Sequence, residues 1–171
     1  MTRSDGQELD SILFPKGTQF NENQIRSLLE QYKLLLETSE KLVARRQTLN
    51  TFFLSVNVLL LSAIGTISKE VTTEHIIAIG IIAISLAGVL LCESWRRLVR
   101  SYSQLNAGKF VVLHLIEQHL PAALFKAEWE ALGGGRDKKK YNPTTSVESW
   151  IPRIFSLIYI LASIVALIRV W

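Results

Sequence analysis

The hydrophobic residues of this chain form three long runs that contain no charged residue. The runs cover residues 51–68, 76–92 and 154–168, and polar segments separate them. A membrane-spanning helix needs about 20 mostly apolar residues, because the hydrocarbon core is about 30 Å thick and an α-helix rises about 1.5 Å per residue. Each run approaches this length once flanking side chains reach the interface. A chain of 171 residues has too small a core to bury three such helices, so the pattern predicts three transmembrane helices.

The polar segment 21–50, before the first run, has an apolar stripe at spacings of three and four residues. This pattern predicts an amphipathic helix with Asn21 or Asn23 as its N-cap. The partner that covers the stripe is either the segment 93–132 or the same helix of a second subunit. We expect residues 1–20 to form a flexible arm. The stripe consists of Ile25, Leu28, Leu29, Tyr32, Leu35, Leu36, Leu42 and Val43, interrupted by Ser39 and Arg46.

The segment 93–150, between the second and third runs, is predicted to be a cytosolic helical region. Pro121 ends or restarts its helix, and three glycines begin a basic loop over 133–143. A third transmembrane helix is expected over 151–171, bent near Pro152 and flanked by Arg153 and Arg169. Tryptophans at the ends of the runs are typical of interfacial aromatic belts: Trp95, Trp150 and Trp171.

Basic residues are distributed unevenly around the first two runs. The link 69–75 contains a single lysine and two glutamates, whereas five arginines lie at the other ends of these runs. Basic residues stay on the cytosolic side, so the N-terminus and 93–150 are predicted to be cytosolic and the C-terminus to lie outside. The net charge of +4 favours contact with anionic lipid rather than nucleic acid, given the adjacent apolar runs. The five arginines are Arg45, Arg46, Arg96, Arg97 and Arg100.

The patterns together predict an all-α integral membrane protein. It would consist of a cytosolic N-terminal helix over 21–50, a transmembrane hairpin over 51–92, the cytosolic region 93–150 and the final transmembrane helix. Homo-oligomerisation is expected, because the stripe on 21–50 is wider than 93–132 can cover alone. The single cysteine, Cys92, excludes an internal disulfide framework and leaves the redox compartment open.

Candidate catalytic or metal-binding groups are scarce. His114 and His119 are five residues apart and therefore lie on different faces of a helix, which makes them poor joint metal ligands. We expect no catalytic residue, cofactor or metal. An enzyme would need a cytosolic pocket that gathers groups such as His114, Glu117 and Glu128.

Two sets of residues are candidates for binding. Asn57 is the one strongly polar group inside the runs, suited either to an interhelical hydrogen bond or to the lining of a pore between subunits. No charged residue lies inside a run, which argues against a proton relay or a voltage sensor. Basic residues beside the membrane are candidates for contact with lipid or a partner: Arg96, Arg97, Arg100, Lys138, Lys139 and Lys140.

Three short sequences after the second run carry a resemblance to a known family. They are SWRRLVRSYSQLNAGKF, IEQHLPAALFKAEWEALG and KKYNPTTSVESWIP, in this order, followed by the last run. In these three sequences and in the layout of its apolar runs, the chain resembles the RipA family of small bacterial inner-membrane proteins. The resemblance implies a homo-octameric protein of the cytoplasmic membrane without established enzymatic activity.

The function predicted from the sequence is non-enzymatic. The leading hypothesis is an oligomeric scaffold or regulator at the cytosolic membrane face, where it binds a protein or acidic lipid. The alternative is an oligomeric pore for ions or small solutes, lined by serines, Asn57 and backbone.

Overall fold

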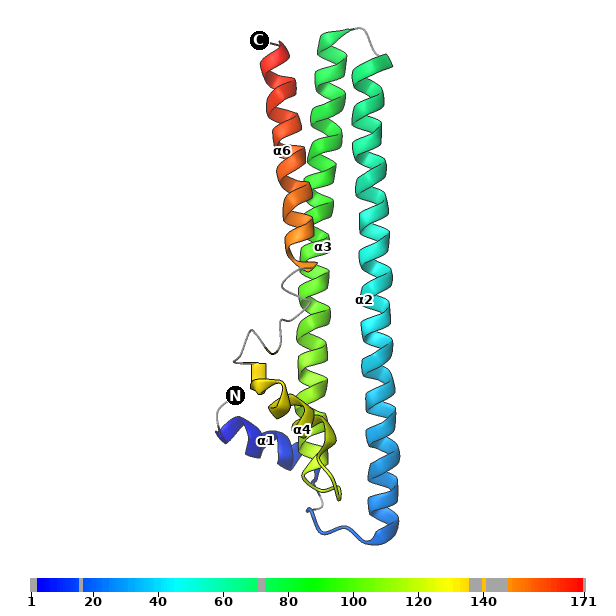
Figure 1. Cartoon of the computed structure of the whole chain (residues 1–171), viewed down its shortest axis with the longest axis vertical. Coiled ribbons are helices and arrows are strands. Elements are labelled where there is room, and N and C mark those ends of the chain that lie inside the picture. Colours follow the sequence, from blue (N-terminus) through cyan, green and yellow to red (C-terminus); the bar gives the residue numbers. More distant parts are fainter. Residues whose placement is uncertain (1–2, 16, 71–72, 136–139, 141–147, 171) are drawn as a thin grey trace. The chain divides into compact units, whose positions relative to one another are not determined.

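The computed structural model describes residues 3–15, 17–70, 73–135, 140 and 148–170, and these residues contain helices and no strand (Figure 1). A short 3₁₀ turn, η1, covers Gly133–Gly135, where all three glycines have positive φ. The helices are α1 (Arg3–Leu13), α2 (Glu22–Glu70), α3 (Glu74–Glu117), α4 (Leu124–Ala131) and α6 (Trp150–Val170).

Three of these helices are long and apolar enough to cross a membrane: α2, α3 and α6. They contain the three apolar runs of the sequence in order. The prediction of an all-α membrane protein with three transmembrane helices is therefore confirmed. Both α2 and α3 continue past their apolar runs as uninterrupted helices, so each also supplies a long polar segment.

The chain divides into two compact units, which we describe separately. The polar unit comprises residues 1–41 and 105–142, and the apolar unit comprises residues 42–104 and 143–171. Helices α2 and α3 each contribute one segment to the polar unit and another to the apolar unit.

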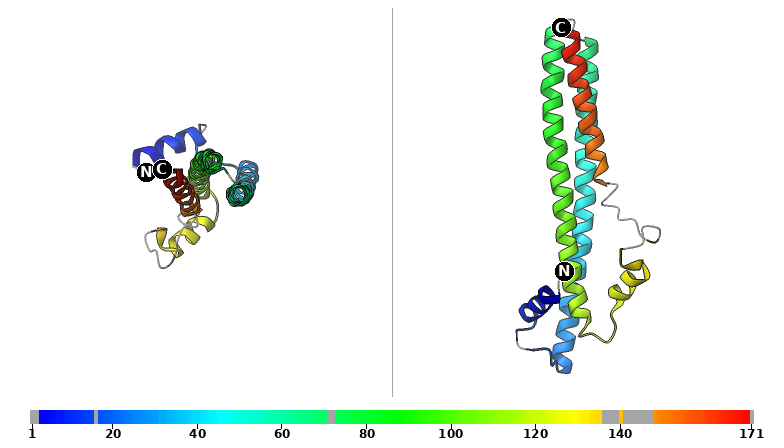
Figure 2. Two further views of the ribbon diagram at one scale, coloured as in Figure 1. Left: turned by 90° about the horizontal axis from the view of Figure 1, so that it is seen from above. Right: turned by 90° about the vertical axis from the view of Figure 1, so that its left-hand side faces the viewer.

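In the apolar unit, α2, α3 and α6 run side by side, as both views of Figure 2 show. One buried cluster is built on Phe53, Trp95 and Val99, with Phe155 of α6 packed against it. The rings of Phe53 and Trp95 are stacked, with centroids 5.6 Å apart. A second cluster joins α3 to α6 through small and branched side chains: Ala78, Ile81 and Ala166.

Trp95, which the sequence suggested for an interfacial aromatic belt, is buried inside the protein. Its side chain is only 2% exposed, and its indole nitrogen donates to Asn50 Oδ1 at 2.8 Å. A buried indole needs a hydrogen-bond acceptor, and Asn50 of α2 supplies one inside the protein. Trp95 is therefore a packing residue between helices, whereas Trp150 is 60% exposed.

In the polar unit, the stripe of α2 packs against the end of α3. Leu28 and Tyr32 of α2 are buried with Leu113 and Ile116 of α3. Two other stripe residues stay partly exposed after this contact, Ile25 at 36% and Leu29 at 38%. Ser39 interrupts the stripe, is 3% exposed and donates to Asn106 Oδ1 of α3 at 2.7 Å. The polar gap in the pattern is thus an interhelical hydrogen bond.

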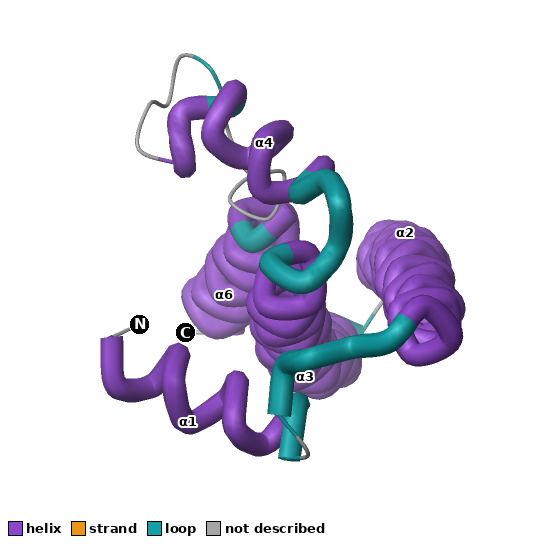
Figure 3. Tube along the Cα trace, turned by 90° about the horizontal axis from the view of Figure 1, so that it is seen from below, coloured by secondary structure: helices purple, strands orange, loops and turns teal. Residues whose placement is uncertain are grey.

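The N-terminal segment differs from the flexible arm that was expected. Residues 3–13 form α1, and Figure 3 shows α1 and α4 on different sides of α3. Phe14 and Phe20 follow α1 and contact His119 edge-on, with ring centroids 4.6 Å and 5.7 Å from the imidazole. Both phenylalanines also pack against the buried cluster of this unit, which attaches the segment to its core.

The first residues of α2 and α6 show which residue caps α2 and how α6 accommodates its proline. Asn21 Oδ1 accepts from the N–H of Gln24 at 2.9 Å, and Gln24 Oε1 accepts from the N–H of Asn21 at 2.8 Å. This reciprocal capping box makes Asn21 the N-cap of α2. Pro152 does not need to bend its helix, because α6 begins only two residues earlier. Backbone N–H groups in the first turn have no acceptor within the helix, so a residue without an N–H loses no hydrogen bond there.

Candidate functional site

Asn57 lies at the centre of a polar contact between all three transmembrane helices. Its side chain is fully buried, at 0% exposed. Its amide nitrogen donates to the Phe53 carbonyl of its own helix at 2.7 Å. Its amide oxygen accepts from Tyr159 of α6 at 3.0 Å and from the Cys92 thiol of α3 at 3.3 Å. The amide therefore joins helices α2, α3 and α6 within one chain.

Gly88 makes room for the tyrosine in this contact. A Cβ at Gly88 would lie 2.5 Å from the ring of Tyr159, closer than such atoms approach in real proteins. Tyr159 itself is 0% exposed and also donates to the Asn57 carbonyl at 3.1 Å. A glycine on α3 is therefore needed for the hydroxyl of α6 to reach α2.

Glu117 holds the polar unit together at the end of α3. Its side chain is 1% exposed and accepts from the Tyr32 hydroxyl at 2.9 Å. Its two oxygens also accept from the backbone N–H groups of Phe125 at 2.8 Å and Lys126 at 3.0 Å. These N–H groups lie in the first turn of α4, whose own N-cap residue, Ala123, offers no side-chain acceptor. Burial and the hydrogen bond to Glu117 raise the pKa of Tyr32 above its ordinary value, so the phenol remains a donor.

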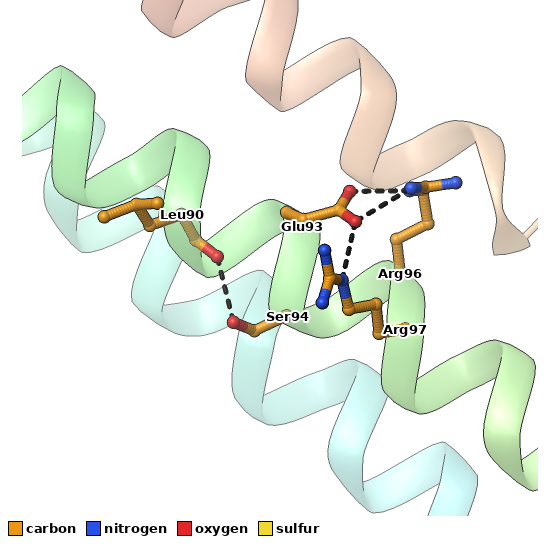
Figure 4. Close-up of polar contacts among 5 residues, drawn as sticks. All are labelled: Leu90, Glu93, Ser94, Arg96 and Arg97. Carbon is orange, nitrogen blue, oxygen red and sulfur yellow. Dashed lines mark hydrogen bonds and ion pairs between the residues drawn. The ribbon is translucent and has the colours of Figure 1, made fainter.

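Two of the three arginines after the second apolar run bind one carboxylate, Glu93. Arg96 donates to Glu93 from Nε and Nη2, both at 2.8 Å, and Arg97 Nε donates at 2.8 Å (Figure 4). The hydrogen bonds from Arg96 and Arg97 lower the pKa of Glu93 to about 2, so the carboxylate is ionised at physiological pH. One negative charge thus offsets one of two adjacent positive charges.

A cavity of about 230 Å³ lies between α3 and α6 beside this group, and we call it the arginine pocket. Its described lining contains three arginines and no acidic residue: Arg96 and Arg100 from α3, and Arg153 from α6. The buried Val99 lines it together with two serines, Ser103 and Ser149. Arg96, Val99, Arg100 and Ser103 share a face of α3, because they are spaced by three and four residues.

The remaining sequence candidates are not gathered with the arginine pocket. Lys138 and Lys139 lie outside the described residues, and Lys140 is exposed. Glu117 serves as the cap of α4, while Glu128 is exposed on that helix. Across the described part of the chain, no group of three or more histidine, cysteine or acidic side chains is arranged to hold a metal ion.

Residues 29–168 match the octameric membrane protein family (8xMP). The chain belongs to this family. The match spans all three apolar runs, both segments of the arginine pocket and Glu117, so the chain is a multi-pass membrane protein of a family described as octameric. It also confirms the resemblance to a family of small octameric membrane proteins. No curated protein and no solved structure shows significant similarity to the chain.

Sequence reasoning missed three residues of these sites. Gly88 and Tyr159 were not singled out, and Arg153 was treated only as a flank of its run. A glycine within an apolar helix is a general signal of close approach, but its partner on α6 is separated from it by about 70 residues. Only the packing of the helices shows which residue fills the space.

Proposed function

We propose that this member of the octameric membrane protein family is a non-enzymatic homo-oligomer of the bacterial inner membrane. It acts as a scaffold or regulator at the cytosolic membrane face, with its N-terminus in the cytosol and its C-terminus outside. The uneven distribution of arginines around the α2–α3 hairpin supports this orientation. The resemblance in sequence supports the bacterial inner membrane, and the family description supports eight subunits.

The observation that carries the scaffold proposal is the complete burial of Asn57. Its amide is satisfied within one chain and is 0% exposed, so it is not available to coordinate a solute between subunits. The outward faces of α3 and α6 in the apolar runs are mainly large aliphatic side chains, which suit lipid or a neighbouring subunit. The groups that we propose for binding are instead the arginines next to the apolar runs and the residues of the polar unit.

We propose that the cytosolic residues contact acidic lipid or a protein partner. Arg96, Arg97 and Arg100 follow the second apolar run, and together with the exposed Lys140 they would supply the positive charge for this contact. Lys138 and Lys139 would add to it. Each basic residue near an anionic membrane surface contributes about 1 kcal/mol of attraction.

A pore remains the second candidate, because α2 carries outward hydroxyls within its apolar run. Ser55 and Ser62 are exposed, and each hydroxyl donates to the carbonyl four residues earlier, at 2.9 Å in both cases. If subunits surround a channel through α2, these hydroxyls would face it. The hydrogen bonds to the helix itself lower the cost of facing lipid, which makes a channel unnecessary to explain them.

Mass and flux measurements on the purified protein test both proposals. Native mass spectrometry in detergent should give a multiple of the 19.3 kDa chain, namely eight copies, and liposomes that contain the protein should leak ions no faster than empty ones. A monomer would refute the oligomer. The pore would replace the scaffold if liposomes with the protein leak ions faster than empty ones and the variants Ser55→Leu and Ser62→Leu abolish this flux. The control Leu86→Ile, on the outward face of α3, should then keep it.

A further inference from the structure

We propose that the arginine pocket binds the phosphate group of an anionic membrane lipid. The proposal deepens the proposed function and rests on its topology, because the pocket must lie at the level of the lipid headgroups. The site lies between α3 and α6, and the lipid phosphate would contact Arg100 and Arg153 together.

The position of the pocket along the helices supports a site at the headgroups. Arg96 and Arg100 follow the end of the second apolar run at Cys92 by four and eight residues, or one to two helical turns. Side chains tilt toward the N-terminus of their helix, so arginines on α3 point back toward the membrane that α3 leaves. Arg153 directly precedes the third apolar run, and the exposed Trp150 beside it is a residue type common at this depth.

The charge of the pocket fits a phosphate. Arg96 is paired with Glu93, whereas Arg100 forms no ion pair with any described residue. The guanidinium of Arg153 lies 5.2 Å from the ring centroid of Trp150, a contact that orients the side chain without neutralising its charge. Guanidinium groups form paired hydrogen bonds with phosphate oxygens, and the N-terminus of α6 at the pocket wall adds a favourable dipole.

The size of the pocket and its surroundings favour a lipid over a free ion. A volume of about 230 Å³ holds several waters, each with a share of about 30 Å³ in the liquid, so it has room for a phosphate and the adjoining glycerol. Acyl chains require an apolar path next to the headgroup. The outward face of α6 provides one immediately after Arg153, with exposed side chains at spacings of three and four residues: Ile154, Leu157 and Leu161.

Lipid binding to the full-length oligomer tests the proposal. Native mass spectrometry in detergent would compare phosphatidylglycerol with phosphatidylcholine, and a further titration would use inorganic phosphate alone. We expect preferential binding of phosphatidylglycerol. The double variant Arg100→Gln/Arg153→Gln should bind it roughly thirtyfold more weakly, because two charges at a membrane surface are lost.

The matched control is Arg26→Gln/Lys126→Gln, which removes the same net charge from exposed positions of the polar unit and should bind as the unchanged protein does. The single variant Arg100→Gln keeps the test valid if the double variant does not assemble, since Arg100 is exposed, and it should show an intermediate loss. Equal binding by the pocket variants and the control would overturn the proposal, as would equal affinity for phosphatidylcholine. Binding of inorganic phosphate as tightly as phosphatidylglycerol would reassign the pocket to a free anion.

The same spectra separate this proposal from the proposed function. An octamer without preference for phosphatidylglycerol would overturn the lipid site and leave the scaffold proposal standing. A monomer that keeps the preference, and loses it in the pocket variants, would overturn the oligomer and leave the site.

Discussion

Two glycines of α3 differ in the space around them, and this space decides whether a larger residue fits at each position. Gly88 is in contact with the Tyr159 ring, whereas nothing lies within 4 Å of a Cβ built at Gly108. Glycine in a helix interior costs about 0.5–1 kcal/mol relative to alanine, so its presence at Gly88 reflects the space that Tyr159 requires. The buried amide of Asn57 depends on that space, because Tyr159 donates to it.

We predict that Gly88→Ala destabilises the protein by about 1–3 kcal/mol, the usual cost of overpacking a buried site. The added methyl would force Tyr159 away from Asn57. Gly108→Ala is the matched control in the same helix and should be neutral or stabilising by up to about 1 kcal/mol. Thermal or denaturant unfolding of the detergent-purified variants measures both. Equal effects of the two substitutions would contradict the close approach.

At the scale of elements, α4 depends on the end of α3. A helix of eight residues is too short to be stable alone in water, and α4 contains no buried residue of its own. Its first-turn N–H groups find their acceptor in Glu117, and Phe125 packs against the cluster that contains Tyr32. One buried carboxylate therefore links α2, α3 and α4.

We predict that Glu117→Ala releases α4 from the polar unit. The substitution leaves the Tyr32 hydroxyl and two backbone N–H groups without their acceptor, and each buried unsatisfied group costs about 1–3 kcal/mol. Hydrogen exchange of the amides of residues 124–131 should become much faster. Glu128→Ala, at an exposed position of α4, removes the same charge and should leave these rates nearly unchanged. Similar rates in both variants would show that the cap does not hold the helix.

At the scale of the whole molecule, the basic residues are unevenly placed around the apolar runs. The arginines lie beside the apolar runs at one end of the α2–α3 hairpin, and the link at its other end is nearly without basic residues. By the positive-inside rule, this distribution predicts that the basic ends lie in the cytosol. Every proposed contact with lipid or a partner depends on that insertion.

We predict that reporter tags after Val71 and after Gly134 report opposite compartments. Alkaline phosphatase should be active at the first position and inactive at the second, and a green fluorescent protein should show the reverse. Tags at both positions in the same compartment would contradict the topology. The arginine pocket would then no longer be assigned to the cytosolic headgroups.

The sequence alone determined the number and order of the transmembrane helices. The length and continuity of an apolar run are local properties, and a spanning helix satisfies its own backbone within the run. The same local reasoning identified Asn57 as the polar group to explain and Pro121 as a break between helices. It also placed the capping position of α2 within two residues.

The tertiary structure alone decided what these residues contact. Trp95 is buried because Phe53 and Asn50 lie opposite it on α2. Glu117 became a cap for α4, and Arg153 joined two arginines of α3, only after distant segments were brought together. The physical reason is that packing and hydrogen bonding depend on distances between residues far apart in the chain, which periodicity along one helix does not encode.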